Sequence, residues 1–224
     1  MPEKTVQKEP GKKPAPSKKP KPQQEVVVQI PLSELHPFPD HPFQVREDAS
    51  MQETAESVKE YGVLVPALAR PREDGGYELI AGHRRKHACE LAGLATMPVI
   101  VRDIDRDAAT IIMVDSNLQR ENILPSERAK AYKMKMEAIK QQGARTDLTS
   151  PKISAKFRSD DEVGQDAGVS GDTIRNYIAL TQLVPELQQM VDEKKIALSP
   201  AYQLAALTPK ELSLIHISEP TRHL

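Results

Sequence analysis

One junction in this chain constrains the fold more than any other segment. A strand-like run at residues 77–80 stops at the small pair Ala81-Gly82, and a helix-like stretch that begins with Arg84 and Arg85 follows directly. A strand that turns at once into a helix is typical of a domain that mixes both elements. Backbone N–H groups at a helix start, with guanidinium groups beside them, form a natural site for phosphate oxygens. The junction therefore predicts a phosphate site.

A second polar junction supports the same interpretation. Asn117 and Arg120 lie near the start of the next helical stretch. Two cationic turns of this kind in one small domain predict a nucleotide or polyphosphate pocket. The two segments are Ala81-Gly82-His83-Arg84-Arg85-Lys86-His87-Ala88 and Asn117-Leu118-Gln119-Arg120-Glu121-Asn122-Ile123-Leu124-Pro125-Ser126-Glu127.

Together the two segments resemble the N-terminal domain of the ParB family, the DNA-partition proteins of bacterial chromosomes, plasmids and mobile elements. In that family the first segment usually reads Gly-Glu-Arg-Arg, the second reads Glu-Asn-x-x-Arg, and both line a pocket that binds CTP and a divalent ion. The resemblance runs from about Ile30 to Leu207 and is closest in style to ParB-like proteins of plasmids and integrative elements. It implies CTP and Mg²⁺ as ligands, with Asn117 at the metal. The cofactor-binding residues that it implies are Gly82, His83, Arg84, Arg85, Asn117 and Arg120.

The chain departs from the family pattern at three places. His83 stands where the family has Glu, and Ser116 stands where it has the Glu that helps to hold the metal. A third family segment, Gln-Pro-Arg in the loop before the first helix, corresponds to His41-Pro42-Phe43, which lacks the cation although Arg46 is close by. Because magnesium usually needs one or two carboxylates besides phosphate oxygens, we expect a weakened metal site. The phosphate-contacting cations are expected to remain, and weak CTP hydrolysis stays open.

The order of the predicted elements indicates the fold class. Strand patterns alternate with helical ones up to residue 102, and only helical patterns follow. This order predicts an α+β ParB-like N-terminal domain followed by an all-α helix-turn-helix domain. The predicted strands lie at residues 26–30, 63–70, 77–80 and 97–102. The predicted ranges are 1–22 for a disordered Lys/Pro-rich tail, 23–122 for the nucleotide-binding domain, 123–211 for the helical domain and 212–224 for a non-native tail.

Local signals mark the ends of two helices. Ser50 and Glu53 have the spacing of a capping box, which predicts a helix with Ser50 as its N-cap. A longer helix is predicted over residues 126–142, ended by Gly143. Its apolar stripe has the spacing of a packed helix and predicts plain core. The stripe consists of Ala129, Tyr132, Met136 and Ile139.

A short helix, a glycine-containing turn and a second helix are predicted over residues 159–178. Gly164 is small enough to let the two helices cross closely. The pattern matches a helix-turn-helix and follows a ParB-like domain, as it does in that family, whereas a helical hairpin without DNA contact is the alternative. Because Arg favours guanine edges and Asn favours adenine edges, the second helix is predicted to read double-stranded DNA. The predicted DNA-binding residues are Ser170, Asp172, Thr173, Arg175 and Asn176.

Charge gives no general support for DNA binding. The first 22 residues hold seven Lys, two Glu and six Pro, a composition that predicts disorder. The whole chain carries a formal charge of −1, so the remainder is acidic and any DNA surface must be local. N-terminal segments of relatives stimulate a ParA-type ATPase, which makes that enzyme the expected partner of the tail. A non-specific arm that tethers DNA is the other interpretation of the same lysines.

Cysteine content and the chain ends set further expectations. Cys89 is the single cysteine, which excludes an internal disulfide and a multi-cysteine zinc site. The sequence has no long apolar run and no signal-peptide pattern, which predicts a cytoplasmic protein without membrane contact. Residues 213–224 resemble translated sequencing-adapter read-through, so we expect a gene truncated near Glu211. Full ParB proteins dimerise through a C-terminal domain, which would then be missing.

These observations favour a ParB-like partition or segregation protein. It is expected to bind a palindromic centromere-like site as a dimer, to be gated by CTP, and to associate with a nucleoid or plasmid. The main alternative is a ParB-like transcriptional regulator without functional nucleotide switching. An enzyme with nuclease or kinase-like activity is a third hypothesis, but the chain offers no Asp/Glu/His cluster suited to two-metal chemistry and no catalytic residue is predicted.

Overall fold

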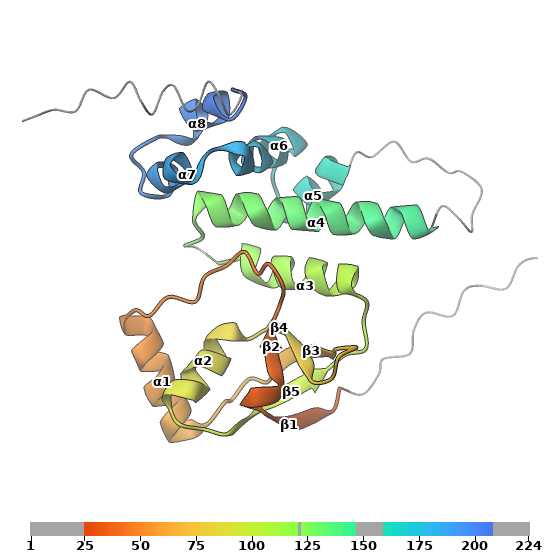
Figure 1. Cartoon of the computed structure of the whole chain (residues 1–224), viewed down its shortest axis with the longest axis vertical. Coiled ribbons are helices and arrows are strands. Elements are labelled where there is room, and N and C mark those ends of the chain that lie inside the picture. The colour runs from red at the N-terminus through yellow and green to blue at the C-terminus, as the bar shows by residue number, and fades with distance from the viewer. Residues whose placement is uncertain (1–24, 121, 147–158, 208–224) are drawn as a thin grey trace, which may run out of the picture.

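The computed structural model describes residues 25–120, 122–146 and 159–207, and Figure 1 shows their arrangement. A mixed β-sheet with helices α1–α3 comes first, and helices α4–α8 follow, which confirms the predicted fold class. The strands are β1 (Val27–Pro31), β2 (Leu35–Pro37), β3 (Ala67–Pro71), β4 (Tyr77–Ala81) and β5 (Thr96–Val101). The helices are α1 (Ala49–Tyr61), α2 (His83–Leu91), α3 (Arg106–Leu118), α4 (Pro125–Thr146), α5 (Ser159–Ala167), α6 (Gly171–Ala179), α7 (Pro185–Asp192) and α8 (Leu198–Leu204), with 3-10 turns η1 (Leu32–Glu34) and η2 (Leu180–Gln182).

The sheet has the strand order β1-β5-β3-β4-β2. Strands β3 and β4 form an antiparallel hairpin, and β1 pairs antiparallel with β5. The β3–β5 and β2–β4 pairs are parallel. Strand β2 was missed, because its three residues lie in a proline-rich stretch that carries no alternating pattern. The predicted tails at 1–22 and 212–224 lie outside the described residues.

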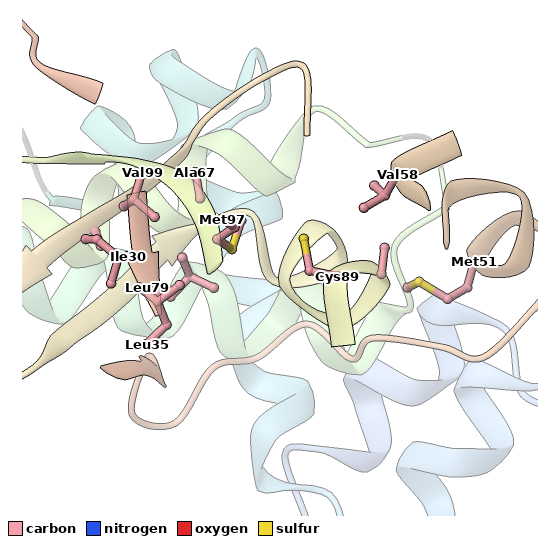
Figure 2. Packing of buried hydrophobic residues seen from close by; sticks show 11 residues of the cluster. Ile30, Leu35, Met51, Val58, Ala67, Leu79, Cys89, Met97 and Val99 are labelled. Atoms are coloured by element: carbon pink, nitrogen blue, oxygen red, sulfur yellow. The ribbon is translucent and has the colours of Figure 1, made fainter. Parts of the chain in front are cut away.

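Both faces of the sheet are covered. Because successive strand residues point to opposite faces, the neighbours Leu79 and Ile80 of β4 enter different cores. Leu79 packs in a cluster with Met97 of β5 and Cys89 of α2, beneath α1 and α2 (Figure 2). Ile80 belongs to a second cluster that includes Met113 of α3. Strand β4 is therefore fixed from both sides, and the turn at its end is held in place.

The helix ends differ in detail from the predicted ones. Helix α1 is capped by Asp48, whose carboxylate accepts a hydrogen bond of 2.9 Å from the Met51 N–H, so the prediction of Ser50 as N-cap is wrong. Ser50 lies inside the first turn, which frees its hydroxyl for a contact described below. Helix α4 continues through Gly143 to Thr146, because one glycine costs a helix only about 1 kcal/mol.

Helix α4 lies between the two parts of the molecule (Figure 1). Its Ala131 packs against the α3 side, whereas Ala129 and Tyr132 pack against the helices that follow. The predicted stripe is therefore core, as expected. Because α4 packs against both parts, its packing assigns it to neither part alone. The domain boundary at residue 122 stays a prediction. No helix in the described ranges is long and apolar enough to cross a membrane.

Candidate functional site

Gly82 connects β4 to α2 in a conformation that other residues rarely adopt. Its φ is 111°, in the left-handed region, and it is the N-cap of α2 without a side-chain cap. A Cβ added there would lie 2.8 Å from the Cβ of Ala67 in β3. Glycine is therefore required both by the backbone angle and by the approach of the hairpin partner. The helix start consequently presents backbone N–H groups without a side-chain cap, as an anion site needs.

The helix start opens onto a cavity of about 260 Å³. Three segments far apart in the sequence form its walls: the loop before α1, the β4–α2 junction and the end of α3. The structure brings all six predicted cofactor residues to this one cavity, and their role in binding stays a prediction. The lining residues are His41, Phe43, Gln44, Val45, Ala81, Gly82, His83, Arg84, Arg85, Ser116, Asn117 and Arg120.

A second cavity of about 630 Å³ shares three lining residues with the first. Gln44, Arg84 and Arg120 line both, and Arg46 adds a third guanidinium to the second cavity. The cation that His41-Pro42-Phe43 lacks is therefore supplied at the second cavity by the nearby Arg46. The missed signal was the register: Gln44-Val45-Arg46 keeps the Gln and the Arg of the family's Gln-Pro-Arg in their order. We call Arg46, Arg84 and Arg120 the arginine cluster.

The two arginines of the β4–α2 junction have different partners. The Nη2 of Arg84 donates to the Ser50 hydroxyl at 3.0 Å and lies 3.8 Å from the Asp48 carboxylate. The Nη1 of Arg85 donates to the carbonyl oxygens of Val65 and Pro66, both at 2.6 Å. Burial lowers the pKa of Arg85, and these carbonyls compensate its loss of water. Arg85 thus ties α2 to the segment before β3, whereas Arg84 faces the cavities.

His83 contributes no charge to the cavity at neutral pH. Its ring packs against that of His41 with a centroid distance of 3.9 Å. Burial, together with repulsion from His41 and Lys86, lowers the pKa of His83 to about 3. Burial also lowers the pKa of His41, although its hydrogen bond of 2.7 Å to the Phe43 carbonyl opposes that shift. A neutral ring thus occupies the place of the family's anionic Glu.

The predicted metal ligand Asn117 is held by protein contacts. Its amide nitrogen donates to the Met113 carbonyl at 2.8 Å, and its oxygen accepts from Arg120 at 3.3 Å. The neighbouring Asp115 is turned away to Lys135, at 2.7 Å. Among the described residues no three His, Cys, Asp or Glu side chains form a group that could hold a metal ion. These residues do not fit a protein-held magnesium ion, because no carboxylate lines the first cavity.

The second part contains two helices joined by a tight turn, α5 and α6 (Figure 1). Gly168 in the turn has a φ of 68°. A Cβ on Gly164 would lie 2.6 Å from the Val169 carbonyl oxygen, so this position needs glycine, as expected for closely crossing helices. Val163 of α5 and Ile174 of α6 are fully buried together with Tyr132 of α4. This geometry is that of a helix-turn-helix packed on α4.

The predicted DNA-binding residues divide into two groups. Ser170 caps α6 by accepting from the Thr173 N–H at 3.2 Å, and the two hydroxyls lie 2.9 Å apart. Asp172, Arg175 and Asn176 are exposed on one face of α6. Arg175 pairs with both Asp160 of α5 and Asp172, which the sequence pattern did not reveal. Its guanidinium is therefore already engaged, and DNA contact by any of these residues stays a prediction.

Two family models match the chain. The model of the ParB N-terminal domain matches residues 16–118, and that of the ParB HTH domain matches residues 152–219. The chain is 36% identical over 186 residues to the chromosome-partitioning protein Spo0J of Thermus thermophilus, a match that covers 83% of this chain and 62% of that protein. It is 37% identical over 182 residues to the probable chromosome 1-partitioning protein ParB of Deinococcus radiodurans, over 81% of this chain and 56% of the relative. The chain thus spans somewhat more than half the length of these relatives.

Solved structures agree with these matches. The C-terminally truncated ParB of Caulobacter crescentus, complexed to the centromeric parS site, superposes with a TM-score of 0.52 at 26% identity. That match covers 85% of this chain and 90% of the other. A Pnob8-like ParB-N domain has a TM-score of 0.55 at 17% identity over 86% of this chain and 84% of its own, and shows the fold alone.

The family models and the relatives cover the same two parts that the structure separates. The relatives named here are chromosomal partition proteins, so the plasmid or integrative-element type stays a prediction. The model matches and the superposition with parS-bound ParB are consistent with the order of domains in the chain. The chain is a member of the ParB family, with a ParB N-terminal domain followed by a ParB helix-turn-helix domain.

Proposed function

We propose that this protein binds double-stranded DNA at a centromere-like site through α6 and acts in DNA partition. The observation that carries the proposal is the exposed face of α6, with Asp172, Arg175 and Asn176 one helical turn apart on a packed helix-turn-helix. The parS-bound ParB of Caulobacter crescentus supports it, since that structure superposes over 85% of the chain. Arg175 and Asn176 suit guanine and adenine edges in a major groove.

The ion pairs of Arg175 give this face a selective character. Asp172 is exposed and negative, so it repels phosphate oxygens that approach without a matching base. At a cognate site Arg175 exchanges its contact with Asp172 for a base edge, while Asp160 continues to hold the guanidinium from behind. On non-cognate DNA the Arg175–Asp172 pair would stay intact, so Arg175 would add little binding free energy.

The N-terminal domain is proposed to bind CTP in the two joined cavities. The arginine cluster and the open start of α2 supply the charge that a triphosphate needs. The choice of CTP rests on the family resemblance. Because no carboxylate lines the first cavity, nucleotide affinity is expected to depend on the arginines.

Three further properties follow from the family and are proposals for this chain. We infer dimerisation on DNA, contact of the Lys-rich N-terminal segment with a ParA-type ATPase, and association with a nucleoid or plasmid in the cytoplasm. The transcriptional regulator remains as the outcome of a test, since nothing among the named relatives favours it.

The test is a binding experiment on the full chain. Affinities for labelled CTP, ATP, GTP and UTP would be measured with magnesium, with a duplex that carries parS, with a scrambled duplex and without DNA. Selective CTP binding and preference for the parS duplex are expected. If the chain binds the parS duplex but none of the four nucleotides, the proposed nucleotide switch is contradicted and the transcriptional regulator is favoured. Equal affinity for both duplexes would contradict the centromere-like site.

A further inference from the structure

Lys135 occupies a position unlike that of the other cations in the described part of the chain. It lies in the middle of α4 with none of its surface exposed. Its Nζ donates to Asp115 of α3 at 2.7 Å and to Asp166 of α5 at 2.9 Å. One buried ammonium group therefore joins three helices, of which α3 completes the N-terminal domain and α5 opens the helix-turn-helix.

The charge on Lys135 is kept despite its burial. Burial lowers its pKa, but the hydrogen bonds and negative charges of Asp115 and Asp166 outweigh that effect and raise the pKa above its ordinary value. A buried cation of this kind depends on its partners, because removal of a partner leaves charge without compensation in a poorly hydrated place. Both carboxylates are thus held against the same nitrogen.

The two carboxylates lie at functional ends of their helices. Asp115 directly precedes Ser116 and Asn117, which line the first cavity. Asp166 lies in the last turn of α5, just before the turn at Gly168. A cavity of about 570 Å³ lies between α3 and α5 at this level, and beside it Leu118 of α3 and Ala167 of α5 pack against the same apolar cluster. Its lining residues are Asp115, Leu118, Gln119, Arg128, Tyr132, Asp166, Ala167 and Val169.

We propose that Lys135 is a positioning residue that couples ligand binding in the nucleotide cavity to the placement of the helix-turn-helix. The inference rests on the proposed function, because it needs both a nucleotide and DNA. A ligand that contacts Ser116 and Asn117 shifts the end of α3, and Asp115 moves with it. Lys135 cannot follow one carboxylate without weakening its bond to the other, so the shift reaches α5. By linkage, DNA on α6 changes nucleotide affinity by the same factor.

Asp166→Asn tests the coupling while Asp115 still pairs with the Lys135 ammonium group. The Asp166 side chain is 58% exposed, and the amide keeps its shape while removing the charge. CTP affinity of the full chain would be measured by calorimetry with and without parS duplex. The wild type is expected to show a ratio of about fivefold or more between the two conditions. In the variant the ratio should fall towards one, while CTP affinity without DNA stays within about twofold.

Matched variants separate coupling from charge and from stability. Glu186→Gln removes one negative charge from the exposed surface of α7 and should leave the ratio unchanged. Lys135→Arg keeps the cation and should show a ratio between one and the wild-type value. Lys135→Met removes the cation, so its melting curve is measured first to check that it folds. A side chain with a purely structural role would change the free energy of unfolding but not the ratio of the two CTP affinities.

The outcomes are distinct. A wild-type ratio in Asp166→Asn would overturn the role of Lys135, and so would a ratio of one in the wild type when both ligands bind. Failure of the wild type to bind any nucleotide would instead remove the nucleotide part of the proposed function, and the inference with it.

Discussion

The arginine cluster and Arg175 show how differently one residue type can be prepared for an anionic partner. In the N-terminal domain, Arg84 donates to the Ser50 hydroxyl and lies 3.8 Å from the Asp48 carboxylate, and Arg120 donates to the Asn117 amide at 3.3 Å. On α6, Arg175 lies between the carboxylates of Asp160 and Asp172. The first arrangement contains one long ion pair, Arg84–Asp48, and otherwise neutral contacts, whereas the second holds its arginine in two close ion pairs and must exchange one of them for a ligand.

This difference suits two kinds of ligand. A nucleotide triphosphate carries its charge in every complex, so a ready cluster of cations gives affinity directly. DNA carries phosphate at every step, so an arginine that is free would bind all sequences alike. An arginine held by carboxylates discriminates between DNA sequences, because only a matching base edge compensates for the ion pair that is broken on binding.

The variant with the largest expected effect changes the turn that positions the arginine cluster. Gly82→Ala places a Cβ 2.8 Å from Ala67 at positive φ, and should lower the free energy of unfolding by about 3 kcal/mol. Gly75→Ala is the matched control, with a φ of 89° but open space, and should cost about 1 kcal/mol. Thermal or urea unfolding measures both. Equal losses would show that backbone angle alone, and not the approach to β3, requires glycine at 82.

The next variant sharpens the comparison inside the junction. Arg84→Ala should weaken CTP binding by about 2 kcal/mol, roughly thirtyfold, because a charge-assisted contact to phosphate is lost. Arg85→Ala should instead lower stability, since its guanidinium donates to Val65 and Pro66. Calorimetric CTP titration and unfolding, performed on each variant, separate the two roles. A normal CTP affinity in Arg84→Ala would place the nucleotide elsewhere.

On α6 the expected effect is somewhat smaller and of a different kind. Arg175→Ala should lower affinity for the parS duplex by about 1.5 kcal/mol and leave CTP binding intact. Asp172→Asn should raise affinity for a scrambled duplex more than for parS, because the exposed carboxylate no longer repels phosphates. Fluorescence anisotropy with both duplexes measures the selectivity. Unchanged selectivity in both variants would contradict the proposed exchange.

The smallest effect concerns pH. The pKa of His83 lies at about 3 in the folded chain and at 6.5 when unperturbed, so acid protonates the unfolded state first. Its contribution to stability is complete above pH 6.5 and is lost as pH falls towards 3. At pH 5.5 the loss is expected to be about 1.4 kcal/mol, the free energy of one pKa unit. His83→Asn should lose less stability than the wild type between pH 7.5 and 5.5. Urea unfolding at the two pH values measures this loss. An identical loss in both proteins would rule out His83 as the source of the pH dependence.

Local sequence signals predicted the framework well. The order of strand and helix patterns gave the fold class, and the β4–α2 junction and the glycines of the helix-turn-helix carried their own evidence. These features depend on residues adjacent in the chain, since strand alternation, left-handed glycine angles and close helix crossings are short-range effects. Where the prediction failed locally, at the N-cap of α1, a stronger acceptor lay two residues earlier in Asp48.

The sequence alone therefore determined the ParB fold class, the position of Gly82 and the segments that meet at the cavities. Only the tertiary structure decided what each charged side chain does there. It assigned Arg85 to the Val65 and Pro66 carbonyls, Arg175 to Asp160, and Lys135 to two carboxylates. The physical reason is that the state of a charge depends on its nearest partners and its burial, and most of those partners come from distant parts of the chain that no local pattern displays.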